Sequence, residues 1–216
     1  MDSLLKKEDM LPDNFKYQII GGRIITNLAP LANPNHGIVS NRLNIAFSNY
    51  FRGKKCRVYH DNNYIRIDIM AKEKDIKIPE KCKNDKFIPD IMVVCDRSID
   101  TLKGVVGAPK LVVEVSSKGT AQYDATIKKD IYAQIGVGEY WIVSPYDKRI
   151  EIYVLENGAY NLHGAYYKYD EDDIEAIREE HEYVKKGGLE IINEFSPYSF
   201  PDLTIRIDDV FDDLIE

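Results

Sequence analysis

Two carboxylates, Asp90 and Glu114, interrupt apolar segments that we expect to form strands, spanning residues 87–95 and 109–117. Burial of an unpaired carboxylate is costly, so each side chain needs a partner. A shared Mg²⁺ would be suitable, because this ion takes hard oxygen ligands, usually one or two carboxylates together with water and phosphate. Alternatively, each acid lies at an edge of the sheet, where it reaches solvent or pairs with a nearby Lys or Arg.

A cation beside such a metal would be expected at position 116, which faces the same side of the strand as Glu114, but the residue there is Ser116. The nearest candidate is Lys128, in the helix that we expect to follow. Its simpler role is a helical salt bridge with Asp124, four residues earlier, which contributes only about 0.2–0.5 kcal/mol. Pro89 cannot donate to a strand ladder, so Asp90 is expected where the sheet opens to solvent. A metal site of this kind requires Asp90, Glu114 and Lys128 to meet in a solvent-accessible notch.

Other catalytic motifs are absent from the sequence. It contains no phosphate-binding glycine loop, no G-x-S-x-G elbow and no C-x-x-C pair. The four histidines, at positions 36, 60, 163 and 181, are too scattered for a zinc site.

The hydrophobic pattern predicts an α/β sheet that positions these residues. Residues 17–25 form a hairpin around a Gly-Gly turn, and a helix follows 33–36 with an apolar stripe of Val39, Leu43, Ala46 and Tyr50. His36 projects from the start of that stripe. Further strands are predicted at 57–60, 64–70, 87–95, 109–117, 139–144 and 149–155, with a strand pair at 158–169. Helices are predicted at 121–135, ending at Gly136, and in the acidic stretch 171–186, followed by a tail of strand and helix.

Composition favours one globular domain over the whole chain, 1–216, with an acidic C-terminal elaboration at about 156–195. The chain has 216 residues, 44% of them apolar, and no apolar run long enough to span a membrane. The first residues do not resemble a signal peptide. Three cysteines at wide spacings suggest free thiols in a reducing cytoplasm. We therefore expect a cytoplasmic protein with no membrane partner.

The net charge of −7 argues against a nucleic-acid partner until its distribution is considered. Residues 170–216 contain 16 acids and 4 bases, which leaves 20 acids and 25 bases in residues 1–169. A body with a net charge of +5 is compatible with a local site for a polyanion.

The order of several motifs closely resembles the Uma-type family of restriction endonucleases, whose fold is similar to that of the PD-(D/E)XK nucleases. The motifs are Pro89-Asp90, Gly107-Ala108-Pro109 leading to Glu114-Val115, Tyr123-Asp124 with Lys128 and Tyr132, and Gly136-Val137 leading to Glu139-Tyr140-Trp141. The resemblance extends to Phe200-Pro201-Asp202-Leu203 and so covers most of the chain. It implies a restriction-endonuclease-like core in which helices flank a mixed central β-sheet, with four strands in the family's common core.

The resemblance also implies roles for individual residues. Asp90 and Glu114 would bind Mg²⁺, with Mn²⁺ as the alternative ion, together with the backbone carbonyl of Val115. Lys128 would be the catalytic cation, with Lys118 as a competitor, and His36 would orient phosphate or water.

The implied activity is hydrolysis of phosphodiester bonds by a metal-dependent endonuclease acting on nucleic acid, with DNA favoured as the substrate and a homodimer as a possible assembly. The alternatives are a catalytically inactive nuclease-fold module that binds nucleic acid, and a regulatory or structural protein whose buried carboxylates pair with lysines.

Overall fold

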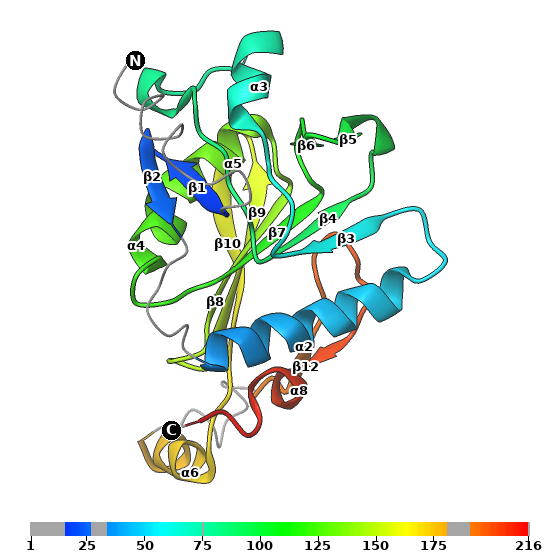
Figure 1. Cartoon of the computed structure of the whole chain (residues 1–216). Coiled ribbons are helices and arrows are strands. Elements are labelled where there is room, and N and C mark those ends of the chain that lie inside the picture. The colour runs from blue at the N-terminus through cyan, green and yellow to red at the C-terminus, as the bar shows by residue number, and fades with distance from the viewer. Residues whose placement is uncertain (1–15, 27–33, 75, 181–190, 216) are drawn as a thin grey trace.

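A six-stranded mixed sheet forms the middle layer of the computed structural model, which describes residues 16–26, 34–74, 76–180 and 191–215. Its spatial order is β10-β9-β8-β7-β4-β3 (Figure 1). The strands are, in chain order, β3 (Arg57–His60), β4 (Ile91–Val94), β7 (Leu111–Val115), β8 (Glu139–Ser144), β9 (Arg149–Glu156) and β10 (Ala159–Tyr167). Only β7 and β8 pair in parallel within this sheet, since a helical crossover joins them, and all other pairs are antiparallel. The expected mixed sheet with flanking helices is confirmed, with β9 and β10 extending the four-stranded core.

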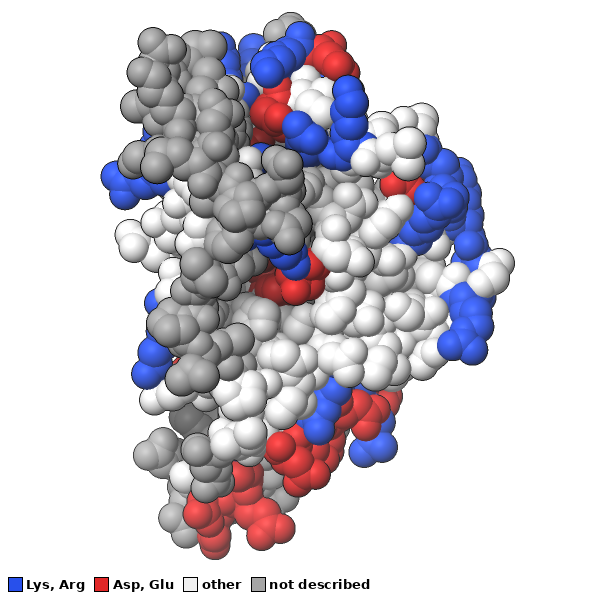
Figure 2. All heavy atoms as spheres, viewed as in Figure 1, with Lys and Arg blue, Asp and Glu red and all other residues white. Residues whose placement is uncertain are grey.

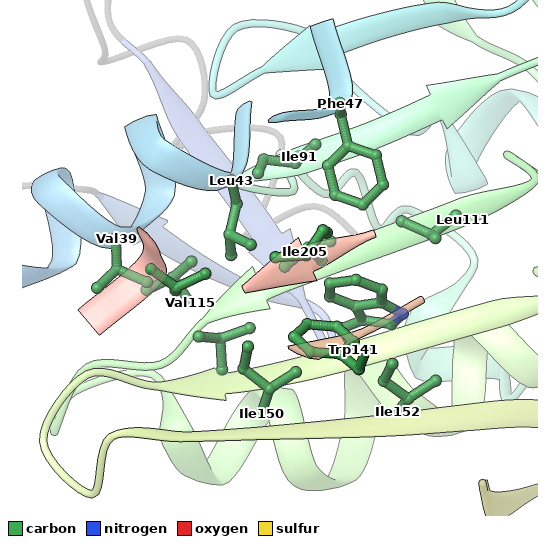
Figure 3. Packing of buried hydrophobic residues seen from close by; sticks show 14 of the residues in the cluster. Val39, Leu43, Phe47, Ile91, Leu111, Val115, Trp141, Ile150, Ile152 and Ile205 are labelled. Atoms are coloured by element: carbon green, nitrogen blue, oxygen red, sulfur yellow. The ribbon is translucent and has the colours of Figure 1, made fainter. Parts of the chain in front are cut away.

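Helix α2 (Pro34–Phe51) covers one face of the sheet. Its buried stripe is Val39, Leu43, Phe47 and Phe51, four residues apart, so one side of the helix faces the sheet. Figure 3 shows three of these side chains pointing toward Ile91, Leu111, Val115, Trp141, Ile150 and Ile152 of the strands. The predicted stripe was right at Val39 and Leu43, whereas Ala46 and Tyr50 lie at its margin. This packing fixes the N-terminal end of α2, which carries His36, relative to the sheet.

A second apolar cluster covers the opposite face of the sheet. It is formed by the helix that follows β7, by α3 (Ile67–Glu73) and by the hairpin of β1 (Tyr17–Ile20) and β2 (Arg23–Thr26). The predicted Gly-Gly turn is confirmed, because Gly21 and Gly22 have φ of +59° and +73°, a conformation that glycine adopts without strain.

The helix after β7 contains a π-helical turn. It runs through α4 (Ala121–Tyr123), the π-turn Asp124–Lys128 and α5 (Lys129–Ile135), and ends at Gly136 with φ of +89° as predicted. Tyr132, Tyr140 and Trp141, which pack between helix and sheet, are fully buried.

The C-terminal part of the chain adds short elements around α2. Helix α6 (Glu171–Glu180) forms part of the predicted acidic helix, and residues 181–186 of that prediction lie outside the described residues. The tail consists of β11 (Glu194–Phe195), β12 (Ile205–Arg206) and α8 (Ile207–Phe211), and α8 packs against α2 (Figure 1). Within the stretch 156–195, residues 159–167 belong to the main sheet, because β10 is its edge strand. None of the helices in the described segments combines the length and hydrophobicity that a membrane crossing requires.

Two predicted strand segments were wrong. Residues 64–70 are not a strand: Ile65 makes isolated bridges with Phe87 and Val105, and the chain then enters α3. Ile67 and Met70 lie three residues apart and are the buried side of that helix. In so short an apolar run, the spacing of a helix cannot be distinguished from the alternation of a strand. Residues 158–169 form one strand and not a pair, because Gly164 lies at a β-bulge and not in a turn.

The expectation of three free thiols was also wrong. Cys56 and Cys95 form a disulfide, and Cys82 is free and buried. The cause is the antiparallel register of β3 and β4, in which Arg57 lies opposite Val94, so the two cysteines lie opposite each other one residue further on. The cysteines thus no longer argue for a reducing compartment.

Three shorter elements complete the described chain. They are 3₁₀ turns at Glu80–Cys82 and Arg97–Ile99, and a small hairpin of β5 (Asp100–Thr101) and β6 (Gly104–Val105).

Candidate active site

The start of β4 and the end of β7 bring Asp90 and Glu114 together. Ile91 pairs with Val113 and Met92 with Val112, so extending this antiparallel register by one residue places Asp90 beside Glu114. Pro89 ends the ladder just before Asp90, as expected from its missing N–H. The two acidic residues are therefore neighbours across the ladder where β4 begins.

Asp90 is held by one contact from the sheet and one from α2. Its Oδ2 accepts a hydrogen bond of 2.7 Å from the backbone N–H of Val115. Its Oδ1 lies 3.3 Å from Nε2 of His36, so the first turn of α2 reaches the same carboxylate. The predicted metal role of the Val115 carbonyl remains a prediction.

Glu114 points to the opposite side of the sheet from α2, toward the helix that contains the π-turn. Its Oε2 lies 2.9 Å from Nζ of Lys128, and its Oε1 accepts a hydrogen bond of 2.7 Å from the hydroxyl of Tyr132. Both carboxylate oxygens of Glu114 are thus engaged by the chain itself.

Asp124 is a third carboxylate in this cluster. Its Oδ1 lies 3.1 Å from Nζ of Lys128, and its Oδ2 accepts a hydrogen bond of 3.2 Å from the Ser116 hydroxyl. Residues Asp124–Lys128 form the π-turn, and such turns often occur at functional sites. The predicted salt bridge of Lys128 with Asp124 on its own helix is therefore confirmed, and Lys128 also pairs with Glu114 on β7. Its role as a catalytic cation remains a prediction.

Burial and charge act in opposite directions on this pair. Burial, together with the charges of Asp124 and Asp90, raises the pKa of the Glu114 carboxyl to about 8, although the Lys128 ammonium opposes that rise. Burial lowers the pKa of Lys128, but Glu114 and Asp124 outweigh it and the net shift is upward. A protonated Glu114 would no longer support the Lys128 charge. The close contact of Lys128 with two carboxylates therefore keeps its ammonium protonated.

The pKa of His36 is also shifted. Burial lowers it, but the hydrogen bond and charge of Asp90, with Asp61 and Glu114 further away, raise it on balance. His36 is therefore more readily protonated than a free histidine, and its positive charge is directed at Asp90.

The expected solvent-accessible notch is found only in part. The side chains of His36 and Asp90 are 29% and 15% exposed, whereas those of Glu114 and Lys128 are 3% and 2% exposed. Solvent therefore reaches the Asp90 side of the cluster, and Glu114 and Lys128 lie behind it.

The predicted Mg²⁺ site remains a prediction, and only the type of its ligands can be compared with what the ion prefers. In the described part of the chain, no group of three or more His, Cys, Asp and Glu side chains could hold a metal ion. Zn²⁺ needs three or four protein ligands. Mg²⁺ takes one or two carboxylates and completes its shell with water and substrate phosphate, so Asp90 and Glu114 are sufficient in kind.

Two participants were not assigned a role from the sequence. Tyr132 was predicted as core, and Asp124 only as a helical salt-bridge partner. The spacing of Asp124, Lys128 and Tyr132 was the available signal, because residues four apart share a face of a helix. Lys118, the alternative cation, lies 5.1 Å from the ring centre of Tyr146, and the described residues include no ion pair between Lys118 and Glu114.

Comparisons with known proteins agree with this fold. A solved structure of a "putative nuclease belonging to DUF820" from Anabaena variabilis matches with a TM-score of 0.64 and 14% identity, covering 98% of each chain. An uncharacterized protein, slr1290, from Synechocystis sp. is 29% identical over 120 residues, 55% of this chain. The match covers only 56% of that relative's length. The model of the Uma2 family, described as "Putative restriction endonuclease", matches residues 3–180. Because this match covers most of the sequence, the chain belongs to the Uma2 family, and its resemblance to that family is confirmed.

Proposed function

We propose that the chain is a metal-dependent endonuclease that hydrolyses phosphodiester bonds of DNA. The meeting of Asp90 and His36 with Glu114 and Lys128 at one end of β4 and β7 carries this proposal. Membership of a nuclease-like family supports it.

Asp90 and Glu114 would hold Mg²⁺, with Mn²⁺ as a substitute. When bound, the ion would polarise a phosphate oxygen and lower the pKa of a water. Oδ2 of Asp90 is fixed by the Val115 N–H, which directs the remaining oxygen toward the exposed side of the cluster, where His36 orients phosphate or water. Lys128 opposes the rise in the pKa of Glu114 and would provide positive charge near the phosphate, a role typical of phosphoryl transfer.

Basic residues at the far end of α2 would contact the flanking phosphates. Arg52, Lys54, Lys55 and Arg57 are exposed around the connection from α2 to β3. Figure 2 shows Lys and Arg gathered along that end of the molecule, while acidic residues gather at the opposite end around α6. DNA would therefore approach from the basic end and avoid the acidic one.

The test is nicking of supercoiled plasmid in Mg²⁺ or Mn²⁺ by the wild type, Asp90→Asn and, as a matched control, Asp202→Asn, which changes an exposed acid. We expect cleavage by the wild type and the control and none by Asp90→Asn. Equal cleavage by all three proteins would place the activity elsewhere or in a contaminant.

One observation favours a second function, a nuclease-fold module that binds nucleic acid without cutting it. The buried ion pair of Glu114 and Lys128 already satisfies the groups that catalysis would need. Binding of DNA without cleavage in any divalent metal would support this module.

A further inference from the structure

Lys128 lies between two buried carboxylates, and only one of them is a proposed metal ligand. Its Nζ is 2.9 Å from Glu114 Oε2 and 3.1 Å from Asp124 Oδ1. A divalent cation at Glu114 would repel the ammonium, which has to remain paired because an unpaired buried charge is strongly destabilising.

Asp124 is fixed by contacts that do not depend on Lys128. Its Oδ2 accepts from the Ser116 hydroxyl, and its backbone carbonyl accepts a 2.9 Å hydrogen bond from the buried Tyr140 hydroxyl. Oδ1 is buried and makes no well-oriented hydrogen bond within the described part of the chain. Asp124 therefore presents an acceptor that can hold the ammonium more closely without moving its own backbone.

The geometry points to Asp124 as a positioning residue that receives the Lys128 ammonium when a divalent cation binds Glu114. This inference rests on the proposed metal-dependent function. Asp124 acts through Lys128 and does not bind the metal itself. Without Asp124, Glu114 is the one ion-pair partner left to Lys128 among the described residues, so the ammonium competes with the cation for that carboxylate.

A double-mutant cycle read by calorimetric titration with Mn²⁺ tests the assignment. The four proteins are the wild type, Asp124→Asn, Lys128→Met and the double variant. We expect Asp124→Asn to weaken Mn²⁺ binding about tenfold when Lys128 is present and less than twofold when Lys128→Met is also present. A direct attraction between Asp124 and the metal would instead give the same loss in both backgrounds, and that result would overturn the inference.

Circular dichroism establishes first that each variant is folded. If Lys128→Met does not fold, Ser116→Ala replaces it, because this change loosens Asp124 and leaves the ion pairs intact. We expect Ser116→Ala to weaken Mn²⁺ binding about threefold, with no further loss when it is added to Asp124→Asn. Wild-type affinity in both Ser116→Ala and Asp124→Asn would overturn the inference.

Plasmid cleavage is measured separately, so that the two proposals can fail independently. A wild type that binds Mn²⁺ but does not cleave refutes the nuclease activity, and the calorimetric cycle still decides the role of Asp124. Absence of Mn²⁺ binding in every variant overturns both the metal site and the role of Asp124.

Discussion

The backbone N–H of Val115 donates a 2.7 Å hydrogen bond to Oδ2 of Asp90, so the sheet itself orients the most exposed carboxylate of the cluster. Asp90→Asn can keep this bond through its amide oxygen, whereas Asp90→Ala leaves the N–H without its acceptor, at a cost of about 1–3 kcal/mol. Comparing Asp90→Asn with Asp90→Ala therefore separates the effect of losing the negative charge from the effect of losing the hydrogen bond.

We expect Mg²⁺ or Mn²⁺ to raise the melting temperature of the wild type and to have no such effect on Asp90→Asn, although this variant melts close to the wild type without metal. Differential scanning fluorimetry measures both values, with Asp202→Asn as control. A metal-induced rise that persists in Asp90→Asn would exclude this carboxylate as a ligand.

Removing one partner of the buried Glu114–Lys128 ion pair should lower the free energy of unfolding more than replacing both partners. Lys128→Met leaves Glu114 buried without its cation, and we expect a loss of about 3–5 kcal/mol in the free energy of unfolding. Adding Glu114→Gln should restore the part of that loss that comes from Glu114, whereas Asp124 stays buried without its cation. Urea unfolding of the wild type, Lys128→Met, Glu114→Gln and the double variant measures the four values, with Lys110→Met, at an exposed site, as control. Additive losses would show that the two residues are not coupled.

The basic end of α2 predicts a change in salt dependence. Each lysine that contacts a phosphate contributes about 0.9 to the slope of log binding constant against log salt concentration. We expect Lys54→Ala/Lys55→Ala to lower the slope by about 1–2 for duplex DNA, measured by fluorescence anisotropy over a range of KCl concentrations. An unchanged slope would mean that DNA does not contact this segment.

Acid pH should stabilise the N-terminal hairpin through Asp85. This buried carboxylate accepts hydrogen bonds from the N–H groups of Gly21 and Gly22, and burial raises its pKa from 3.8 to about 6. Between pH 4 and 6 the folded state retains a proton that the unfolded state has released, so stability falls as pH rises through this window. The total loss in the free energy of unfolding across this window is about 3 kcal/mol.

Urea unfolding at several pH values should show this decline in the wild type and a smaller one in Asp85→Asn. Asp85→Asn still offers an oxygen to one of the two glycine N–H groups. The exposed-site variant Asp202→Asn should follow the wild type. Parallel curves for wild type and Asp85→Asn would refute the assignment.

Reduction should destabilise the protein through the Cys56–Cys95 disulfide. The two residues are 39 positions apart, and closing a loop of this length in the unfolded chain is worth about 2–4 kcal/mol. Dithiothreitol should therefore lower the free energy of unfolding of the wild type by that amount and leave Cys56→Ser/Cys95→Ser unchanged. The folded wild type can be titrated for thiols without reductant. Free thiols at both Cys56 and Cys95 would contradict the pairing.

The sequence predicted the elements whose apolar patterns are long or distinctive. The α2 stripe, the Gly-Gly hairpin and the two strands carrying Asp90 and Glu114 were located from such patterns alone. Residues 64–70 were misassigned because a short apolar run fits a helix and a strand equally well, and tertiary contacts decide between them.

The candidate site was predicted as a set of residues but not as a geometry. Spacing placed Lys128 on the face of Asp124, yet it could not show that Glu114 also reaches this ammonium. The burial of both groups, like the Cys56–Cys95 disulfide, depends on which strands become neighbours. Which strands become neighbours depends on contacts between residues far apart in the chain, and local patterns in a single sequence do not reveal these contacts.

Helix α2 also sets a length scale. Its 18 residues span about 27 Å, with His36 in its first turn and the basic segment just beyond its last. For a duplex lying along the helix, that span corresponds to about eight base pairs at 3.4 Å each. In the proposed function, the length of α2 would therefore set the distance between the phosphate at the candidate site and the phosphates bound by the basic segment. Oligonucleotides much shorter than this distance could still occupy the candidate site but would not reach the basic segment.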